Sequence, residues 1–79
     1  MSTKLKVVSG KQLLKLLQGL GFVLMRVKGS HHRLKHADGR VTTVPVHKND
    51  PIAKGLLHKI ITQDIQISIE DYNKLVDEL

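Results

Sequence analysis

The chain has 79 residues, enough for one small domain with a single modest core, so any site is expected to be shallow. It carries 13 lysines and arginines against 7 aspartates and glutamates, and the formal charge of +6 favours a polyanionic partner, with nucleic acid the first candidate. The absence of cysteine excludes disulfides, thiolate metal sites and cysteine nucleophiles. No signal-peptide pattern and no long basic amphipathic helix are present, so we expect a cytoplasmic location and no membrane partner.

The N-terminal part of the chain predicts a capped helix followed by a strand. Ser9 and Gln12 have the spacing of a capping box, and apolar residues recur behind them at helical spacing, namely Leu13, Leu16, Leu17 and Leu20. We therefore predict a helix over about 10–20, closed by Gly21 in a left-handed conformation. The β-branched and aliphatic stretch 22–28 then predicts a strand.

Two turn signals predict a three-stranded antiparallel sheet. Gly29-Ser30 fits a type II′ turn, because its first position needs a positive φ. The register that follows from this turn pairs Lys28 with His31, Arg26 with Arg33, and Met25 with Leu34.

The second turn, Ala37-Asp38-Gly39, fits a three-residue loop with a glycine bulge. This loop pairs Leu34 with Thr42 and His31 with Pro45. A two-residue Asp38-Gly39 turn would instead place valines on the charged face, so we prefer the bulged register.

This register sorts the sheet into an apolar inner face and a basic outer face. The inner face, expected to pack on helices, consists of Val23, Met25, Val27, Leu34, Val44 and Val46. The outer face consists of Arg26, Lys28, His31, Arg33, Lys35, Thr43 and His47. Arg26 opposite Arg33 is a like-charge pair, and an anion bound between the two would remove the conflict.

Two further helices are predicted after the sheet. Asp50 as N-cap and Pro51 at the first helical position predict a helix over about 51–62, with an apolar face of Ala53, Leu56, Leu57, Ile60 and Ile61. Ser68 and Asp71 form a capping-box pattern before a short acidic helix. The order helix, three strands, helix predicts a single α+β domain over 1–79, like the double-stranded RNA-binding fold, with a short C-terminal helix.

The basic outer face is the candidate site. We assign RNA binding to Arg26, Lys28, Gly29, Ser30, Arg33 and Lys35. The four cations are expected to bind phosphates, and Gly29-Ser30 forms the turn between the strands. His31 is the candidate proton-transfer residue, although a single histidine in a chain of this size is more often a solvated or packing residue. His47 lies diagonal to it as a candidate helper, or simply begins the next loop.

The other histidines are expected to be structural or solvated. His32 and His36 share the inner face with Leu34, and His58 falls on a helix surface. The histidines divide between the two sheet faces and no carboxylate joins them, so no metal site and no cofactor is predicted.

An ordered set of short motifs resembles the HicA toxin family of small mRNA interferases over residues 8–61. The motifs are Ser9-Gly10-Lys11, Gly21-Phe22, Lys28-Gly29-Ser30-His31-His32, Asp38-Gly39-Arg40, Thr43-Val44-Pro45-Val46-His47 and Lys54-Gly55. The resemblance implies an RNA-cleaving toxin neutralised by a HicB-family antitoxin, with His31 of Gly-Ser-His as the catalytic residue. Many relatives carry a small hydroxyl residue and an arginine where this chain has Leu56 and His58, and the stretch 63–66 lacks the usual glycine.

RNA carries its own nucleophile, the 2′-hydroxyl, so a small enzyme needs only to position the chain, move protons and stabilise the phosphorane. Which proton a histidine moves is not determined by the sequence. Two other classes fit the same features: a non-catalytic RNA-binding module and a protein-interaction domain whose basic face docks an acidic partner. The small number of aromatic residues, Phe22 and Tyr72, disfavours single-strand binding by base stacking.

Overall fold

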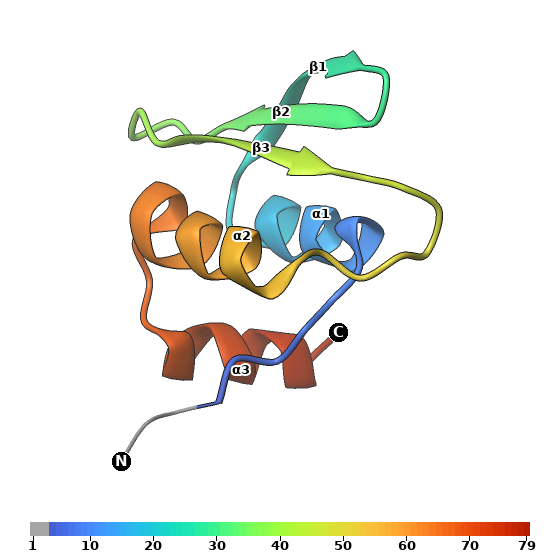
Figure 1. Cartoon of the computed structure of the whole chain (residues 1–79). Coiled ribbons are helices and arrows are strands. Elements are labelled where there is room, and N and C mark those ends of the chain that lie inside the picture. The colour runs from blue at the N-terminus through green and yellow to red at the C-terminus, as the bar shows by residue number, and fades with distance from the viewer. Residues whose placement is uncertain (1–3) are drawn as a thin grey trace.

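Figure 1 shows the computed structural model of the chain, which describes residues 4–79. The elements follow the order α1 (Gly10–Gly19), β1 (Val23–Lys28), β2 (His31–Lys35), β3 (Val41–Pro45), α2 (Lys54–Lys59), η1 (Ile60–Ile65) and α3 (Ile69–Asp77). The sheet forms one layer, α1 and the α2–η1 helix form the next, and α3 lies beneath them beside the N-terminal segment (Figure 1). The predicted α+β class and the double-stranded RNA-binding type of fold are confirmed.

The first helix forms as the sequence predicts. The Ser9 hydroxyl accepts from the Gln12 amide at 3.3 Å, and the Gln12 side chain accepts from the Ser9 amide at 2.9 Å, which completes the capping box. Residue 10 must be glycine, because a Cβ there would lie 2.3 Å from the Pro45 carbonyl oxygen. This close approach fixes the start of α1 against the end of β3.

The sheet has the order β1-β2-β3, and both turns are as predicted. Gly21, Gly29 and Gly39 all adopt positive φ. The β2–β3 register pairs Leu34 with Thr42 and His31 with Pro45, as expected.

The β1–β2 register is correct only at the turn end. Lys28 pairs with His31 and Arg26 with Arg33, but a bulge then places Leu24, not Met25, opposite Leu34. An extra residue in one strand changes the sheet face to which the side chains beyond it point. The alternation of faces predicted from the sequence therefore does not extend past Arg26.

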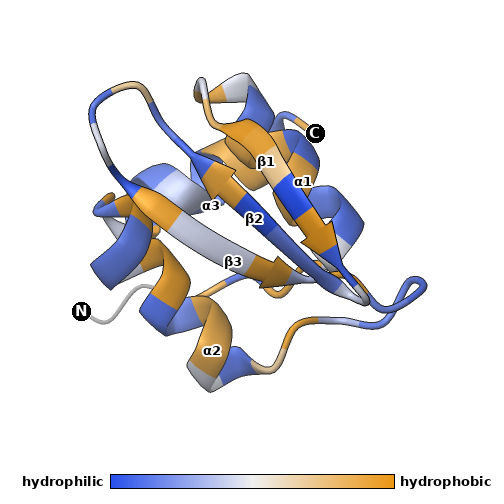
Figure 2. Cartoon of the chain, turned by 90° about the horizontal axis from the view of Figure 1, so that it is seen from above, coloured by the Kyte–Doolittle hydropathy of each residue, from blue (hydrophilic) through white to orange (hydrophobic). Residues whose placement is uncertain are grey.

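The prediction that β1 contributes to the core was wrong. Val23, Met25 and Val27 are 60%, 61% and 51% exposed, while Leu34 and Val44 are fully buried. Figure 2 shows apolar residues along β1 at the edge of the sheet, beside the mostly polar β2. β3 is also an edge strand, but α1 and η1 pack against it and not against β1, so the β-branched pattern of β1 forms a strand without burying it.

The second helix begins and ends later than predicted. Pro51 lies in an extended bridge with Ser9, and the Ile52 amide donates to the Val8 carbonyl at 2.9 Å, so α2 starts only at Lys54. Ile52 is buried in this arrangement, and that packing overrides the Asp50-Pro51 helix signal. The helix then continues as the π-helix η1 to Ile65, instead of ending at about 62.

The core lies between the sheet and the helices. From the predicted helical face, Leu57, Ile60 and Ile61 are buried, whereas Ala53 is exposed and Leu56 is 39% exposed. Ser68 caps α3 by accepting from the Asp71 amide at 3.0 Å, and the buried Tyr72 hydroxyl donates to the Lys6 carbonyl at 2.6 Å. Within residues 4–79, no helix has the length and apolar character needed to cross a bilayer.

Candidate functional site

His31 is the first residue of β2 and follows the Gly29-Ser30 turn directly. The turn is held from two sides, because the Ser30 carbonyl accepts from the Val46 amide at 2.7 Å and from the His32 ring Nδ1 at 3.1 Å. His32 therefore points inward as a structural residue, and the alternation of the strand places His31 on the outer face. The His31 side chain is exposed, and no side-chain hydrogen bond to it is made from within residues 4–79.

Three of the predicted phosphate-binding cations surround His31. Arg26, Lys28, Arg33 and Thr43 line, together with His31, a hollow of about 210 Å³ on the outer face. Arg26 and Arg33 are directly paired across the two strands, and Arg33 Nη1 donates to Thr43 Oγ1 at 3.4 Å. A like-charge pair without an acid in the same hollow is a favourable place for an anion.

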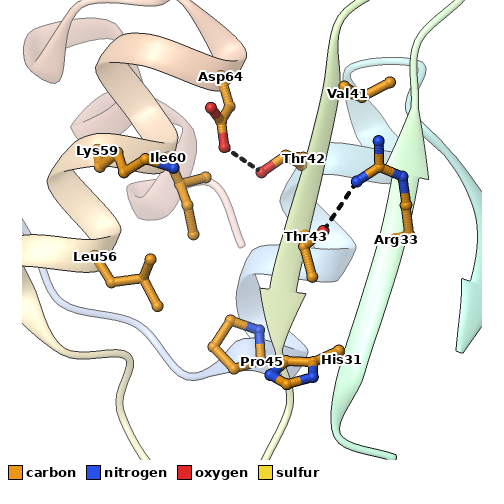
Figure 3. A pocket seen from close by; sticks show the side chains of 10 residues that line it. All are labelled: His31, Arg33, Val41, Thr42, Thr43, Pro45, Leu56, Lys59, Ile60 and Asp64. Carbon is orange, nitrogen blue, oxygen red and sulfur yellow. Dashed lines mark hydrogen bonds between the residues drawn. The ribbon is translucent and has the colours of Figure 1, made fainter. Parts of the chain in front are cut away.

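A second, larger hollow lies along the free edge of β3, on the other side of His31. We call it the β3 groove; its volume is about 450 Å³ and it runs between β3 and the α2–η1 helix (Figure 3). Its lining residues are His31, Arg33, Val41, Thr42, Thr43, Pro45, Leu56, Lys59, Ile60 and Asp64. His31, Arg33 and Thr43 line both hollows, so the histidine stands where the two meet.

The sequence missed the residues that the α2–η1 helix contributes to the groove. Lys59, Ile60 and Asp64 lie across from β3, and the Thr42 hydroxyl donates to Asp64 Oδ2 at 3.0 Å (Figure 3). No local pattern relates a helix residue to a strand about twenty positions earlier. The sequence feature that could have indicated this groove was Asp64, an acidic residue shortly after the apolar residues Ile60 and Ile61 in a basic chain.

Two predicted site residues lie apart from the others. Lys35 lies at the opposite end of β2, in a shallow hollow with Val23, Met25 and His36. His47 follows the end of β3, is exposed, and has its Nδ1 3.7 Å from Asp50 Oδ2. Neither residue is among those lining the two hollows at His31.

His36 and Arg40 are structural residues. His36 Nε2 donates to the Leu20 carbonyl at 3.1 Å, while its Nδ1 accepts from the Asp38 amide at 3.1 Å, and its ring packs edge-on against Phe22. Arg40 bonds Asp38 Oδ2 at 2.8 Å, donates to the Ile65 carbonyl, and lies over the Phe22 ring. The Arg40 backbone amide, hydrogen-bonded to the Asp38 carboxylate, is the main cause that lowers the pKa of Asp38.

The fold and the cationic outer face define the class first: a small basic α+β protein of the double-stranded RNA-binding type. Residues 10–65 match the family model described as HicA toxin of bacterial toxin-antitoxin, and the chain therefore belongs to the HicA toxin family. That family is generally associated with nuclease activity, and membership implies a cognate antitoxin as partner. A search of curated proteins found no match to the chain.

Proposed function

We propose that this protein is a metal-independent endoribonuclease that cleaves mRNA by attack of the 2′-hydroxyl on the adjacent phosphate, with His31 as the catalytic histidine. The observation that carries the proposal is the position of His31, exposed at the junction of the cationic hollow and the β3 groove. In this mechanism the 2′-oxygen loses a proton and bonds to phosphorus, and the bond to the 5′-oxygen breaks as that oxygen gains a proton. The products are a 2′,3′-cyclic phosphate and a free 5′-hydroxyl.

The surroundings of His31 support these roles. An imidazole accepts or donates a proton near neutral pH, and the ring is free to approach the 2′-oxygen or the leaving oxygen. Arg26, Lys28 and Arg33 supply positive charge for the phosphate and for the phosphorane that forms from it. His47 finds less support as a helper, because it lies outside both hollows.

The cognate antitoxin is proposed to be of the HicB family, as the family resemblance suggests, and to block this same face. An antitoxin that presents acidic side chains to Arg26, Lys28 and Arg33 would compete directly with RNA phosphates, because both need the same cations.

The test is cleavage of a defined RNA by the purified protein, with and without EDTA, beside a substrate carrying a single 2′-deoxy nucleotide at the mapped scissile position. We expect cleavage that survives EDTA, leaves a cyclic phosphate, and spares the deoxy substrate. Cleavage of the deoxy substrate, or activity restored only by added divalent metal, contradicts the mechanism. Tight RNA binding without any cleavage would assign the fold to a non-catalytic RNA-binding module.

A further inference from the structure

Asp64 is an acid in a groove that otherwise carries cations. It shares the β3 groove with Arg33, Lys59 and His31, in a chain of net charge +6. A carboxylate repels the phosphates that the neighbouring cations attract, so its presence there needs a reason of its own. A carboxylate instead binds well to a ligand group that presents hydrogen-bond donors and carries no negative charge.

The hydrogen bonding of Asp64 leaves most of its acceptor capacity unused. The Thr42 hydroxyl donates to Oδ2 at 3.0 Å, and within residues 4–79 this is the one hydrogen bond to the carboxylate. An aspartate side chain offers about four acceptor positions. Thr42, which is buried at 2% exposure, therefore fixes the orientation of the carboxylate, while Oδ1 accepts no hydrogen bond from within residues 4–79.

The walls around Asp64 suit a flat heterocycle. Val41 and Leu56 are 38% and 39% exposed, and Ile60 lies between Leu56 and Asp64 along the helix side of the groove (Figure 3). A volume of about 450 Å³ lies within the range of roughly 300–1,000 Å³ typical of small-molecule sites. Asp64 also belongs to the π-helix η1, and such widened turns occur often at functional sites.

The groove is continuous with the proposed reaction centre. Asp64 and Thr42 lie at one end, and His31 and Pro45 lie at the other (Figure 3). Thr42 and Pro45 are three residues apart on β3, which corresponds to about 10 Å along the strand. A nucleotide whose phosphate lies at His31 and Arg33 can therefore extend its base toward Asp64.

We propose that the β3 groove binds the base of the nucleotide next to the cleaved phosphate, and that Asp64 selects guanine. The proposal rests on the RNA-cleaving function proposed above and adds its base specificity. Guanine presents two adjacent donors, N1–H and the 2-amino group, which match the two oxygens of a carboxylate. Its neighbouring O6 is an acceptor for Lys59, whereas adenine, cytosine and uracil each lack the paired donors. Single-stranded RNA exposes these base edges for such contacts.

The experiment measures binding, so it does not depend on cleavage. His31→Ala protein is titrated into fluorescein-labelled uridine heptamers that carry one central guanine, inosine, adenine or cytosine, alongside the all-uridine heptamer, and anisotropy is recorded. We expect guanine to bind about tenfold more tightly than adenine, cytosine or uridine, in keeping with the usual worth of a bidentate base contact. Inosine, which keeps N1–H but lacks the 2-amino group, should fall between.

The variants separate base selection from general charge effects. Asp64→Asn should remove the guanine preference and keep the fold, because the asparagine oxygen still accepts from Thr42. Glu78→Gln removes the same charge at the exposed C-cap residue of α3, outside both hollows, and should leave the preference unchanged. Lys59→Ala leaves the Thr42–Asp64 contact intact and should also reduce the preference for guanine. It therefore tests the proposal even when Asp64→Asn does not fold.

Each outcome decides between the two proposals. If the guanine preference is lost in Asp64→Asn, and the protein with His31 intact does not cleave RNA, the groove proposal is supported and the nuclease function is contradicted. Cleavage without a guanine preference, or with a preference that Asp64→Asn keeps, overturns the groove proposal alone. Equal binding of all heptamers, with Asp64→Asn weakening only the cognate antitoxin, also overturns it and assigns the groove to the protein partner.

Discussion

The two ends of β2 carry similar residues in different surroundings. At the start of the strand, His31 and Arg33 are exposed, and Arg33 makes a single long hydrogen bond, to Thr43. Beyond its end, His36 and Arg40 use their side chains to join three parts of the chain, the α1–β1 connection, the β2–β3 loop and the end of η1. A histidine and an arginine thus form a candidate reaction centre at one end and a structural hub at the other.

The difference shows that residue type alone does not assign a role in this protein. The cation of the hub, Arg40, is already paired with Asp38 and with the Ile65 carbonyl, and it adds little to the attraction of a polyanion. Cations at the His31 end face solvent beside another cation and keep their full capacity for an anion. The comparison therefore predicts that substitutions at the two ends separate activity from stability.

The largest expected effect is on activity at the His31 end. His31→Ala should lower RNA cleavage by about 10²–10⁴-fold, the usual contribution of a general acid or base. It should change the free energy of unfolding by no more than about 0.5 kcal/mol, because an exposed side chain contributes little to the core. Rates on a labelled RNA, growth inhibition in cells, and urea unfolding measure both quantities. Full activity in His31→Ala would contradict the assignment of the His31 end of β2 as the reaction centre.

The matched substitution at the hub should have the opposite result. His36→Ala removes the part-buried hydrogen bond to Leu20 and the exposed one from the Asp38 amide, at a cost of about 0.5–1.5 kcal/mol for each bond. Urea unfolding should show this loss of stability, and cleavage per folded molecule should stay close to that of the unchanged protein. A stable His36→Ala protein with impaired chemistry would mean that the hub takes part in the reaction.

Arg33 and Lys35, two cations of β2 that were both predicted to bind phosphate, provide a finer comparison. Arg33→Ala should reduce the slope of log affinity against log salt by about one unit, because one phosphate contact is lost. Lys35→Ala should reduce it less, since Lys35 lies outside the hollow at His31. Binding of one RNA at several salt concentrations gives both slopes. Equal slopes for the two variants would mean that Lys35 also contacts a phosphate and that RNA binds along the whole of β2.

The smallest expected effect is a pH dependence confined to the hub. The Arg40 amide lowers the pKa of Asp38 below its ordinary value of 3.8, so Asp38 stabilises the folded state above that pH and loses this contribution as the pH falls through its lowered pKa. Asp38→Asn should therefore show a slightly shallower decline in unfolding free energy between about pH 5 and pH 2. Urea unfolding at a series of pH values measures the difference, and identical slopes would contradict it.

Much of the scaffold was predictable because its signals are local. The Ser9–Gln12 cap, the Gly29-Ser30 turn and the bulged Asp38-Gly39 loop each depend on a few adjacent residues. The two turns set the registers of the two hairpins, and the second one places His31 opposite Pro45. The sequence also separated His31 from His32 and His36, because alternation along a strand assigns opposite faces. The assignment of chemistry to His31 stays a prediction that the experiments above test.

The errors fall where a distant part of the chain decides the outcome. The bulge at Met25 and the exposure of β1 depend on which part of the sheet the helices cover, and the late start of α2 depends on Ile52 packing beside Val8. The β3 groove arises only when Lys59 and Asp64 meet a strand about twenty residues earlier.

The sequence by itself determined the capped first helix, the turns, the strand pairing near the turns and the basic outer face, because hydrogen bonding between near neighbours and side-chain alternation act over short distances. The tertiary structure decided which apolar residues are buried and which polar residues meet. Burial and long-range contact depend on how the helix layer covers the sheet, and that arrangement is fixed only when the whole core packs together.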